Sequence, residues 1–344
     1  MSLGPEPVSS IYDSRLRGNT LKLLDKKNLI NRPHIVLKTS FYTLTKWNIP
    51  ERSHSELKTI FGKTLFTKLE TADSYFSHEE KFEKIKLNAD SLDSLLQGGI
   101  DLGCITEFYG QSGSGKTQLC LQLALNCQLP RHLGGLDGKA IYISTDKAFP
   151  IKRLAKMEKA MNTESKIKFM DNIFIFEFNT GKNLQHFVEN DLKMILSVNQ
   201  GCVKLLIIDS IAGIYRTETN YIERAKEMCK IFRELQKAAD KHNFAIVATN
   251  HVTSDPNKLN NSEIPAIGNF WSTLLTTRIR VNKTERIQQF KVNDQEEALK
   301  IRTIKVDFSP RLPPNTAEFI VSSNGVQSFS EDRLPSKQLR ESRT

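Results

Sequence analysis

The chain has 344 residues, enough for about two domains. Apolar residues make up 39% and charged residues 26%, a globular balance that excludes a largely disordered or collagen-like chain. Lys and Arg outnumber Asp and Glu by 49 to 39, and the resulting charge of +10 permits a polyanionic partner such as nucleic acid without requiring one.

The sequence predicts neither a membrane span nor a disulfide framework. No run approaches the roughly 18 consecutive apolar residues of a span, and Met1–Pro7 lacks the pattern of a secretory signal. We therefore expect no membrane partner. The odd cysteine count, without a C-x-x-C pair, predicts reduced and buried thiols in a cytosolic or nuclear protein; these are Cys104, Cys120, Cys127, Cys202 and Cys229.

Residues 1–78 are polar and interrupted, with helix-like spacing at Leu21–Leu24 and Ser55–Phe61. They predict a small helical N-terminal domain and linker, and residues 79–344 a second domain. From Lys84, strands alternate with helices, which is typical of a parallel sheet covered on both faces. We expect strands over 105–109, 139–144, 173–176, 203–208 and 244–249, helices over 118–128, 183–198 and 222–242, and hairpin strands over 274–281, 300–308 and 317–323 that extend the sheet.

A phosphate-binding loop is indicated at Gly110–Thr117, which fits G-x-x-x-x-G-K-[ST] between a strand and a helix. Glycines let backbone N–H groups surround phosphate oxygens, and the following helix adds partial positive charge. Lys116 would contact the β/γ-phosphates and Thr117 would bind Mg²⁺. The alternative is an ordinary Gly-rich turn. The candidate nucleotide-binding residues are Gly110, Gln111, Ser112, Gly113, Ser114, Gly115, Lys116, Thr117 and Gln118.

Polar side chains stand at the ends of three further strands. Asp209 ends the strand 203–208 and is a candidate Mg²⁺ ligand; otherwise it caps a turn with Ser210. Asp146 follows the strand 139–144 and could orient an attacking water, or simply form a turn. His251 could sense a γ-phosphate, or be a satisfied core histidine. We take Asp146 and His251 as the catalytic candidates.

The segments Leu95–Ile100 and Gly103–Cys120 resemble the ATPase core of the RecA/RadA recombinase family. Gln128–Pro130, Ala140–Ile143 and Thr145–Asp146 continue the same pattern. The resemblance implies an α/β fold: a RecA-like P-loop ATPase core with a mostly parallel sheet and C-terminal β-hairpins, preceded by a small helical N-terminal domain.

Within the family, the chain resembles the DNA-repair paralogues of the X-ray-repair cross-complementing three, or spindle-B, type more than the main eukaryotic recombinase. The features are Gly134–Leu136 followed by Ala148–Leu154, Pro265–Gly268 before Trp271, Ser309–Pro314, and a short loop after Arg216.

The resemblance also implies roles for matching positions. Lys116, Thr117 and Asp209 would bind Mg-ATP, and Arg153 would pack on the adenine. Residues 216–223 and 252–270 would face DNA, although they carry few cations, with Arg216 and Lys258 the main ones.

Three departures from the family pattern affect activity and assembly. Asp146 replaces a Glu and is shorter by about 1.5 Å, and His251 replaces a Gln. We therefore expect ATP binding with slow hydrolysis. The oligomerisation motif Phe-x-x-Ala falls on Leu69–Ala72, where Leu removes an aromatic anchor, so docking to a related subunit is expected rather than long filaments.

The implied function is an ATP-binding recombinase paralogue in homologous-recombination repair of double-strand breaks and in meiotic recombination, in the nucleus. It would bind single-stranded or branched DNA with a partner paralogue and assist the main strand-exchange recombinase. The alternative is a non-hydrolysing assembly subunit in which ATP is structural glue at a subunit interface. A small-molecule kinase is not favoured, because no Arg-rich lid segment is visible.

Overall fold

The computed structural model describes residues 24, 39–51, 53–58, 83–146, 148–161, 167–199, 201–216, 220–254, 263–292 and 295–329. The chain divides into two compact units, Met1–Lys81 and Phe82–Thr344. The described part of the first unit is helical, with α4 (Phe41–Lys46) capped by Ser40, whose hydroxyl accepts the Thr43 N–H at 3.3 Å. Several predicted features lie outside the described residues: the segment Leu69–Ala72, Lys258, and parts of the segments Leu21–Leu24 and Ser55–Phe61.

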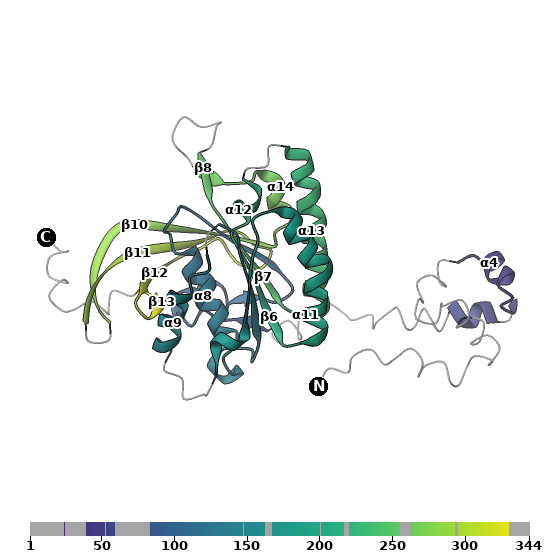
Figure 1. Cartoon of the computed structure of the whole chain (residues 1–344), viewed down its shortest axis with the longest axis horizontal. Helices are drawn as coiled ribbons and strands as arrows, with labels where there is room; N and C mark the ends of the chain where they lie inside the picture. The colour runs from purple at the N-terminus through teal and green to yellow at the C-terminus, as the bar shows by residue number, and fades with distance from the viewer. Residues whose placement is uncertain are drawn as a thin grey trace. The chain divides into compact units, whose positions relative to one another are not determined.

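The second unit is built on a nine-stranded sheet in the order β13-β12-β11-β10-β3-β7-β6-β4-β5 (Figure 1). The six strands from β10 to β5 are parallel, and β11, β12 and β13 follow as antiparallel neighbours. The strands are β3 (Ile105–Tyr109), β4 (Lys139–Ser144), β5 (Ile173–Glu177), β6 (Val203–Asp209), β7 (Ala245–Asn250), β10 (Thr277–Val292), β11 (Gln295–Phe308), β12 (Thr316–Ser322) and β13 (Gly325–Ser328).

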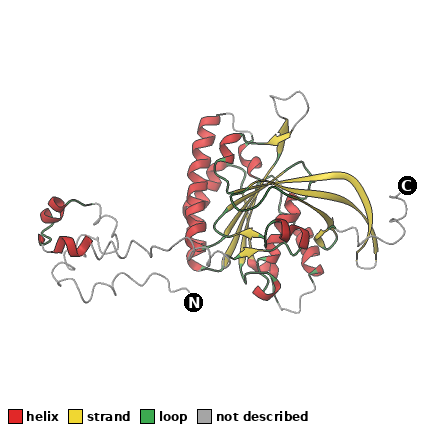
Figure 2. Cartoon of the chain, turned by 180° about the vertical axis from the view of Figure 1, so that it is seen from behind, coloured by secondary structure: helices red, strands yellow, loops and turns green. Residues whose placement is uncertain are grey.

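Helices cover both faces of this sheet (Figure 2). One core lies beneath α7 (Asp90–Leu95), α8 (Lys116–Asn126) and α9 (Ile151–Ala160). The other lies beneath α10 (Gly181–His186), α11 (Leu192–Val198), α12 (Ile211–Tyr215), α13 (Tyr221–His242) and α14 (Asn269–Ser272). Alternate residues of β6 enter opposite cores, Leu205 and Ile207 one and Leu206 and Ile208 the other, which explains the continuous apolar run.

The predicted α/β architecture is therefore confirmed, including the antiparallel C-terminal strands. Four details differ. A π-helical turn (Phe187–Asp191) interrupts the predicted helix 183–198. A small hairpin of β8 (Val252–Ser254) and β9 (Glu263–Pro265) stands in the predicted loop 252–270, β13 adds a last strand, and β1 (Lys84–Ile85) pairs with β2 (Ile100–Asp101). The prediction of five buried thiols holds for Cys120 and Cys127 only; Cys104 and Cys229 are partly exposed, and Cys202, which follows α11, lies in an exposed turn. Among the described residues, no helix has the length and apolarity needed to cross a bilayer.

A buried ion pair ties the centre of the sheet to its C-terminal half. The Glu107 carboxylate of β3 is fully buried and accepts hydrogen bonds from Asn250 of β7 at 2.8 Å and Trp271 of α14 at 2.6 Å. Its other oxygen accepts from Arg278 of β10, whose guanidinium also donates to Ser272 at 2.8 Å. A buried carboxylate needs such partners. The hydrogen bonds of Glu107 therefore hold β3, β7, α14 and β10 in fixed positions relative to one another.

Removing this carboxylate should destabilise the core strongly. We expect Glu107→Ala to lower the free energy of unfolding by about 3–5 kcal/mol, because Arg278 would stay buried without its counter-ion. Urea unfolding followed by circular dichroism measures the loss. Glu223→Ala, which breaks an exposed pair with Lys226, is the matched control and should cost at most about 1 kcal/mol. Equal costs for the two variants would contradict the structural role of Glu107.

Candidate functional site: a nucleotide cavity at the sheet edge

The loop between β3 and α8 adopts a conformation that depends on glycine. Gly110 has a φ of +156°, and a Cβ at this position would lie 1.9 Å from the Val281 carbonyl oxygen. Gly115 caps α8 in a left-handed conformation with a φ of +113°. A side chain at either position would force the loop to move. The loop is followed directly by the first turn of α8, where backbone N–H groups without an intrahelical partner favour an anion.

Lys116 is the cation of this loop. Its side chain is largely buried, and its ammonium donates to the carbonyl oxygens of Gly110 and Gln111, each at 2.8 Å. Burial lowers the pKa of Lys116 from its ordinary value, and the nearby Asp209 opposes that shift. The ammonium is thus satisfied by loop carbonyls that a phosphate oxygen could replace.

Asp209, at the end of β6, is surrounded by hydroxyl donors. Its Oδ2 accepts from Thr117 at 2.8 Å and Tyr142 at 2.6 Å, and its Oδ1 accepts from Thr249. Burial, together with the charge of Asp209, raises the pKa of Tyr142 well above its ordinary value, so the phenol remains a donor. Asp209 is not the turn cap of the alternative interpretation, because Ser210 caps α12 instead.

The same oxygens fit a magnesium ion. Mg²⁺ prefers oxygen ligands and commonly combines one or two carboxylates with substrate phosphates and waters. Thr117 and Asp209 place a hydroxyl and a carboxylate side by side next to the phosphate loop. In the part of the chain that the structure describes, no group of three His, Cys, Asp or Glu residues could hold a metal by itself. A Mg²⁺ here would therefore depend on the nucleotide for most of its ligands.

Asp146 and His251 meet across the ends of β4 and β7. Asp146 Oδ2 accepts a hydrogen bond from Ser210 Oγ at 2.5 Å and lies 3.1 Å from His251 Nε2. Both side chains are one-third exposed, so His251 is not a buried core histidine. Asp146 is likewise not a simple turn residue, because its carboxylate bonds to side chains of two neighbouring strand ends.

These groups line one cavity of about 750 Å³. Of the predicted site residues, it is lined by Ser112, Gly113, Gly115, Lys116, Thr117, Gln118, Asp146, Asp209 and His251. Gly110, Gln111 and Ser114 belong to the loop but do not line the cavity. Arg153 also lies outside the lining, and its guanidinium donates to Gln118 and to the carbonyls of Ser322 and Ser323 at 2.6–3.0 Å.

Two arginines of the cavity lining were not predicted as nucleotide-site residues. Arg302 of β11 lines the cavity beside Gly115, and its buried Nε has no hydrogen-bond partner among the described residues. Burial lowers the pKa of this guanidinium. Arg216 lines the same cavity, although its sequence position suggested a DNA-facing role. Arg302 was missed because it lies more than 180 residues after the phosphate loop, and local sequence spacing does not reveal contacts between segments so far apart.

The phosphate loop also contacts the small hairpin of β8 and β9. Gln111 donates to Glu263 at 2.6 Å, and Glu263 forms an ion pair with Arg280 at 3.5 Å. Asn250, next to His251, donates to the Ala266 carbonyl at 2.9 Å. The segment expected to face DNA is thus joined to the phosphate loop and to the end of β7 by side-chain contacts at Glu263 and Ala266.

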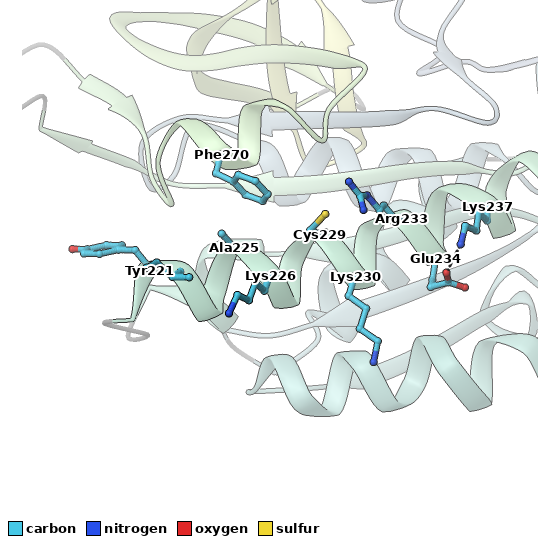
Figure 3. Close-up of a pocket in the computed structure, with 10 residues that line it drawn as sticks. Tyr221, Ala225, Lys226, Cys229, Lys230, Arg233, Glu234, Lys237 and Phe270 are labelled. Atoms are coloured by element: carbon cyan, nitrogen blue, oxygen red, sulfur yellow. Dashed lines mark hydrogen bonds and ion pairs between the residues drawn. The ribbon is translucent and has the colours of Figure 1, made fainter.

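A second groove, of about 720 Å³, runs along the exposed face of α13 (Figure 3). Figure 3 shows Phe270 leaning over the helix between Ala225 and Cys229. Three of its four cations are already ion-paired on the surface, Lys226 with Glu223, Lys230 with Glu189 and Lys237 with Glu234. The groove shares no lining residue with the nucleotide cavity, so it is a separate, charged helix face.

A phosphate loop after β3, a carboxylate at the end of the parallel strand β6 and a mixed sheet closed by antiparallel strands define a RecA-like P-loop ATPase core. The family model described as Rad51 matches residues 79–329, and the chain belongs to this family. The chain is similar to "DNA repair protein rhp51" of Schizosaccharomyces pombe (strain 972 / ATCC 24843), with 28% identity over 337 residues, 94% of this chain and 86% of that protein.

Lys116→Ala should abolish tight ATP binding. The variant removes the ammonium from the loop, so the charge of the β/γ-phosphates is poorly countered there. Titration with a fluorescent ATP analogue in the presence of Mg²⁺ measures the affinity. Lys226→Ala, which removes an exposed lysine of α13, is the matched control and should bind as the wild type does. Unchanged affinity of Lys116→Ala would show that the nucleotide site lies elsewhere.

Proposed function

We propose that the chain is an ATP-binding recombinase paralogue of homologous-recombination DNA repair that hydrolyses ATP slowly. The observation that carries the proposal is the composition of the cavity. Lys116, Thr117 and Asp209 meet there as a phosphate and Mg²⁺ site, while the candidate base, Asp146, has a short side chain held by Ser210.

Each residue has a distinct task in this proposal. The loop N–H groups and Lys116 bind the phosphates, and Thr117 and Asp209 hold Mg²⁺, which would neutralise charge on the transferred phosphoryl group. Asp146 accepts a hydrogen bond from the attacking water and orients it. His251 contacts the terminal phosphate and, through the adjacent Asn250, lies next to the segment 252–270. Nucleotide and DNA binding are coupled through this connection in our proposal.

The further parts of the proposal rest on the family and on the resemblance to repair paralogues. The relative from fission yeast is named a DNA repair protein. We infer single-stranded or branched DNA as the polyanionic partner, a related paralogue as the neighbouring subunit, assistance to the main strand-exchange recombinase in double-strand break and meiotic repair, and a nuclear location. The net charge of +10 suits a polyanionic partner.

A second candidate function is an assembly subunit in which ATP is not hydrolysed. The specific observation in its favour is that Asp146 Oδ2 already interacts with Ser210 and His251, which leaves less acceptor capacity for a water. Under this hypothesis ATP stabilises a subunit interface and turnover is irrelevant. The two functions differ in whether phosphate is released at all.

Lengthening the candidate base discriminates between them. We expect Asp146→Glu to raise phosphate release by about tenfold or more while leaving ATP affinity nearly unchanged, because misplacement of a reacting group by about 1.5 Å can cost roughly a hundredfold. Phosphate release is measured for both proteins with and without single-stranded DNA. A large loss of rate in Asp146→Glu would contradict the hypothesis that the short side chain limits turnover. No release from either protein, with ATP bound, would support the assembly function.

The expected dependence on a partner can be tested separately. Leu69–Ala72 retains an apolar anchor of the oligomerisation motif but not its aromatic residue, so we expect poor solubility of the chain alone and stabilisation by a paralogue. Light scattering and thermal melting are compared for the chain alone and co-expressed with candidate paralogues. A monodisperse chain whose cooperative melting is unaffected by each tested paralogue would argue against this expectation.

A further inference from the structure

Gly213 is a glycine whose backbone does not require one. It lies inside α12 and has no positive φ, so any residue could adopt its backbone conformation. Glycine in a helix is less favourable than alanine by about 0.5–1 kcal/mol. The space around residue 213 explains why a glycine is present there. A Cβ at residue 213 would lie 2.4 Å from Asp146 Oδ1 and 2.5 Å from Thr145 Oγ1, far closer than real contacts allow.

The missing side chain thus leaves a niche for the Asp146 carboxylate. Its Oδ1 rests against Gly213, and its Oδ2 accepts the Ser210 hydroxyl at 2.5 Å and faces His251 Nε2. Oδ2 is therefore engaged by two partners, while Oδ1 lies against Gly213. A hydroxyl–carboxylate bond of this length is among the stronger hydrogen bonds in proteins, so the carboxylate is held firmly.

The residues that form this niche are themselves fixed. Ser210 is almost fully buried and caps α12, with its Oγ accepting the Gly213 N–H at 3.1 Å. Its backbone N–H donates to Thr145 Oγ1 at 2.8 Å, and Thr145 Oγ1 donates back to the Ser210 carbonyl at 2.5 Å. These reciprocal bonds lock the end of β4 to the first turn of α12, and Asp146 is next in the chain after Thr145.

We propose that Gly213 and Ser210 are positioning residues that hold the Asp146 carboxylate against α12 and so restrain it from orienting the attacking water. This inference rests on the proposed function and deepens it, because it adds a second cause of slow turnover to the short side chain. Releasing the carboxylate would let it turn into the cavity that it already lines. An accepting oxygen would then be free for the water, as base catalysis requires.

The test is ATP turnover of Ser210→Ala and Gly213→Ala. Ser210→Ala removes the donor to Asp146, and Gly213→Ala fills the niche while improving helix propensity. We expect each variant to raise kcat at least about threefold. The KM for ATP should stay within about twofold, because the phosphate and Mg²⁺ ligands are unchanged. A merely structural role for these residues predicts lower activity in both variants.

Two controls make the experiment decisive. Combining each variant with Asp146→Ala should abolish the gain if it acts through this carboxylate. Thr180→Ala removes the cap of α10, a comparable capping hydroxyl that does not line the cavity, and should leave kcat unchanged. A gain that persists without Asp146, or a kcat at or below that of the wild type in both variants, would overturn the proposal.

The outcome is separable from the proposed function itself. Each protein is also titrated with the fluorescent ATP analogue and Mg²⁺. Failure of the wild type to bind would reject the nucleotide site and with it the restraint. Normal ATP binding without an increase in kcat in either variant would reject only the restraint of Asp146. The assignment of the ATP site would then remain valid.

Discussion

The structure depends on the convergence of parallel strands at one edge of the sheet. β3, β4, β6 and β7 all end at this edge, so residues near positions 110, 146, 209 and 251 become neighbours although some lie more than 100 residues apart. Strands of a parallel sheet expose their last carbonyls and the following loops there, which makes this edge the place for polar ligands. The apolar side chains of each strand fix its register in the sheet. The register in turn determines which polar residues meet in the cavity.

Two carboxylates on strands of the same sheet, Glu107 and Asp209, have different kinds of hydrogen-bond partner. Glu107 lies inside the sheet, where its oxygens are saturated by Asn250, Trp271 and Arg278, so it holds elements together and offers nothing to a ligand. Asp209 lies at the sheet edge, where its donors are hydroxyls of Thr117, Tyr142 and Thr249. Neutral hydroxyls can turn toward a metal or a phosphate, whereas the ion pair of Glu107 cannot exchange its partner without cost.

The same edge accounts for the connection between the nucleotide and the segment 252–270. Gln111 reaches Glu263, and Asn250 reaches the Ala266 carbonyl. These bonds involve the residue after the first glycine of the phosphate loop and the residue before His251. A movement of the phosphate loop around a bound phosphate would therefore be transmitted to Glu263 of β9. Coupling between nucleotide binding and DNA binding requires that these contacts have two alternative arrangements. Phosphate release measured with and without single-stranded DNA tests for such coupling.

The sequence alone determined the order of strands and helices, because runs such as 205–208 are fully apolar and apolar residues in 222–242 repeat with helical period. It also located Lys116, Thr117, Asp209, Asp146 and His251, because a phosphate loop and polar residues at strand ends carry local patterns. Only the tertiary structure showed Ser210 and Gly213 against Asp146, Arg302 beside Gly115, and the exposure of Cys202. The physical reason is that side-chain neighbours across different strands depend on sheet order and register, which local spacing does not encode.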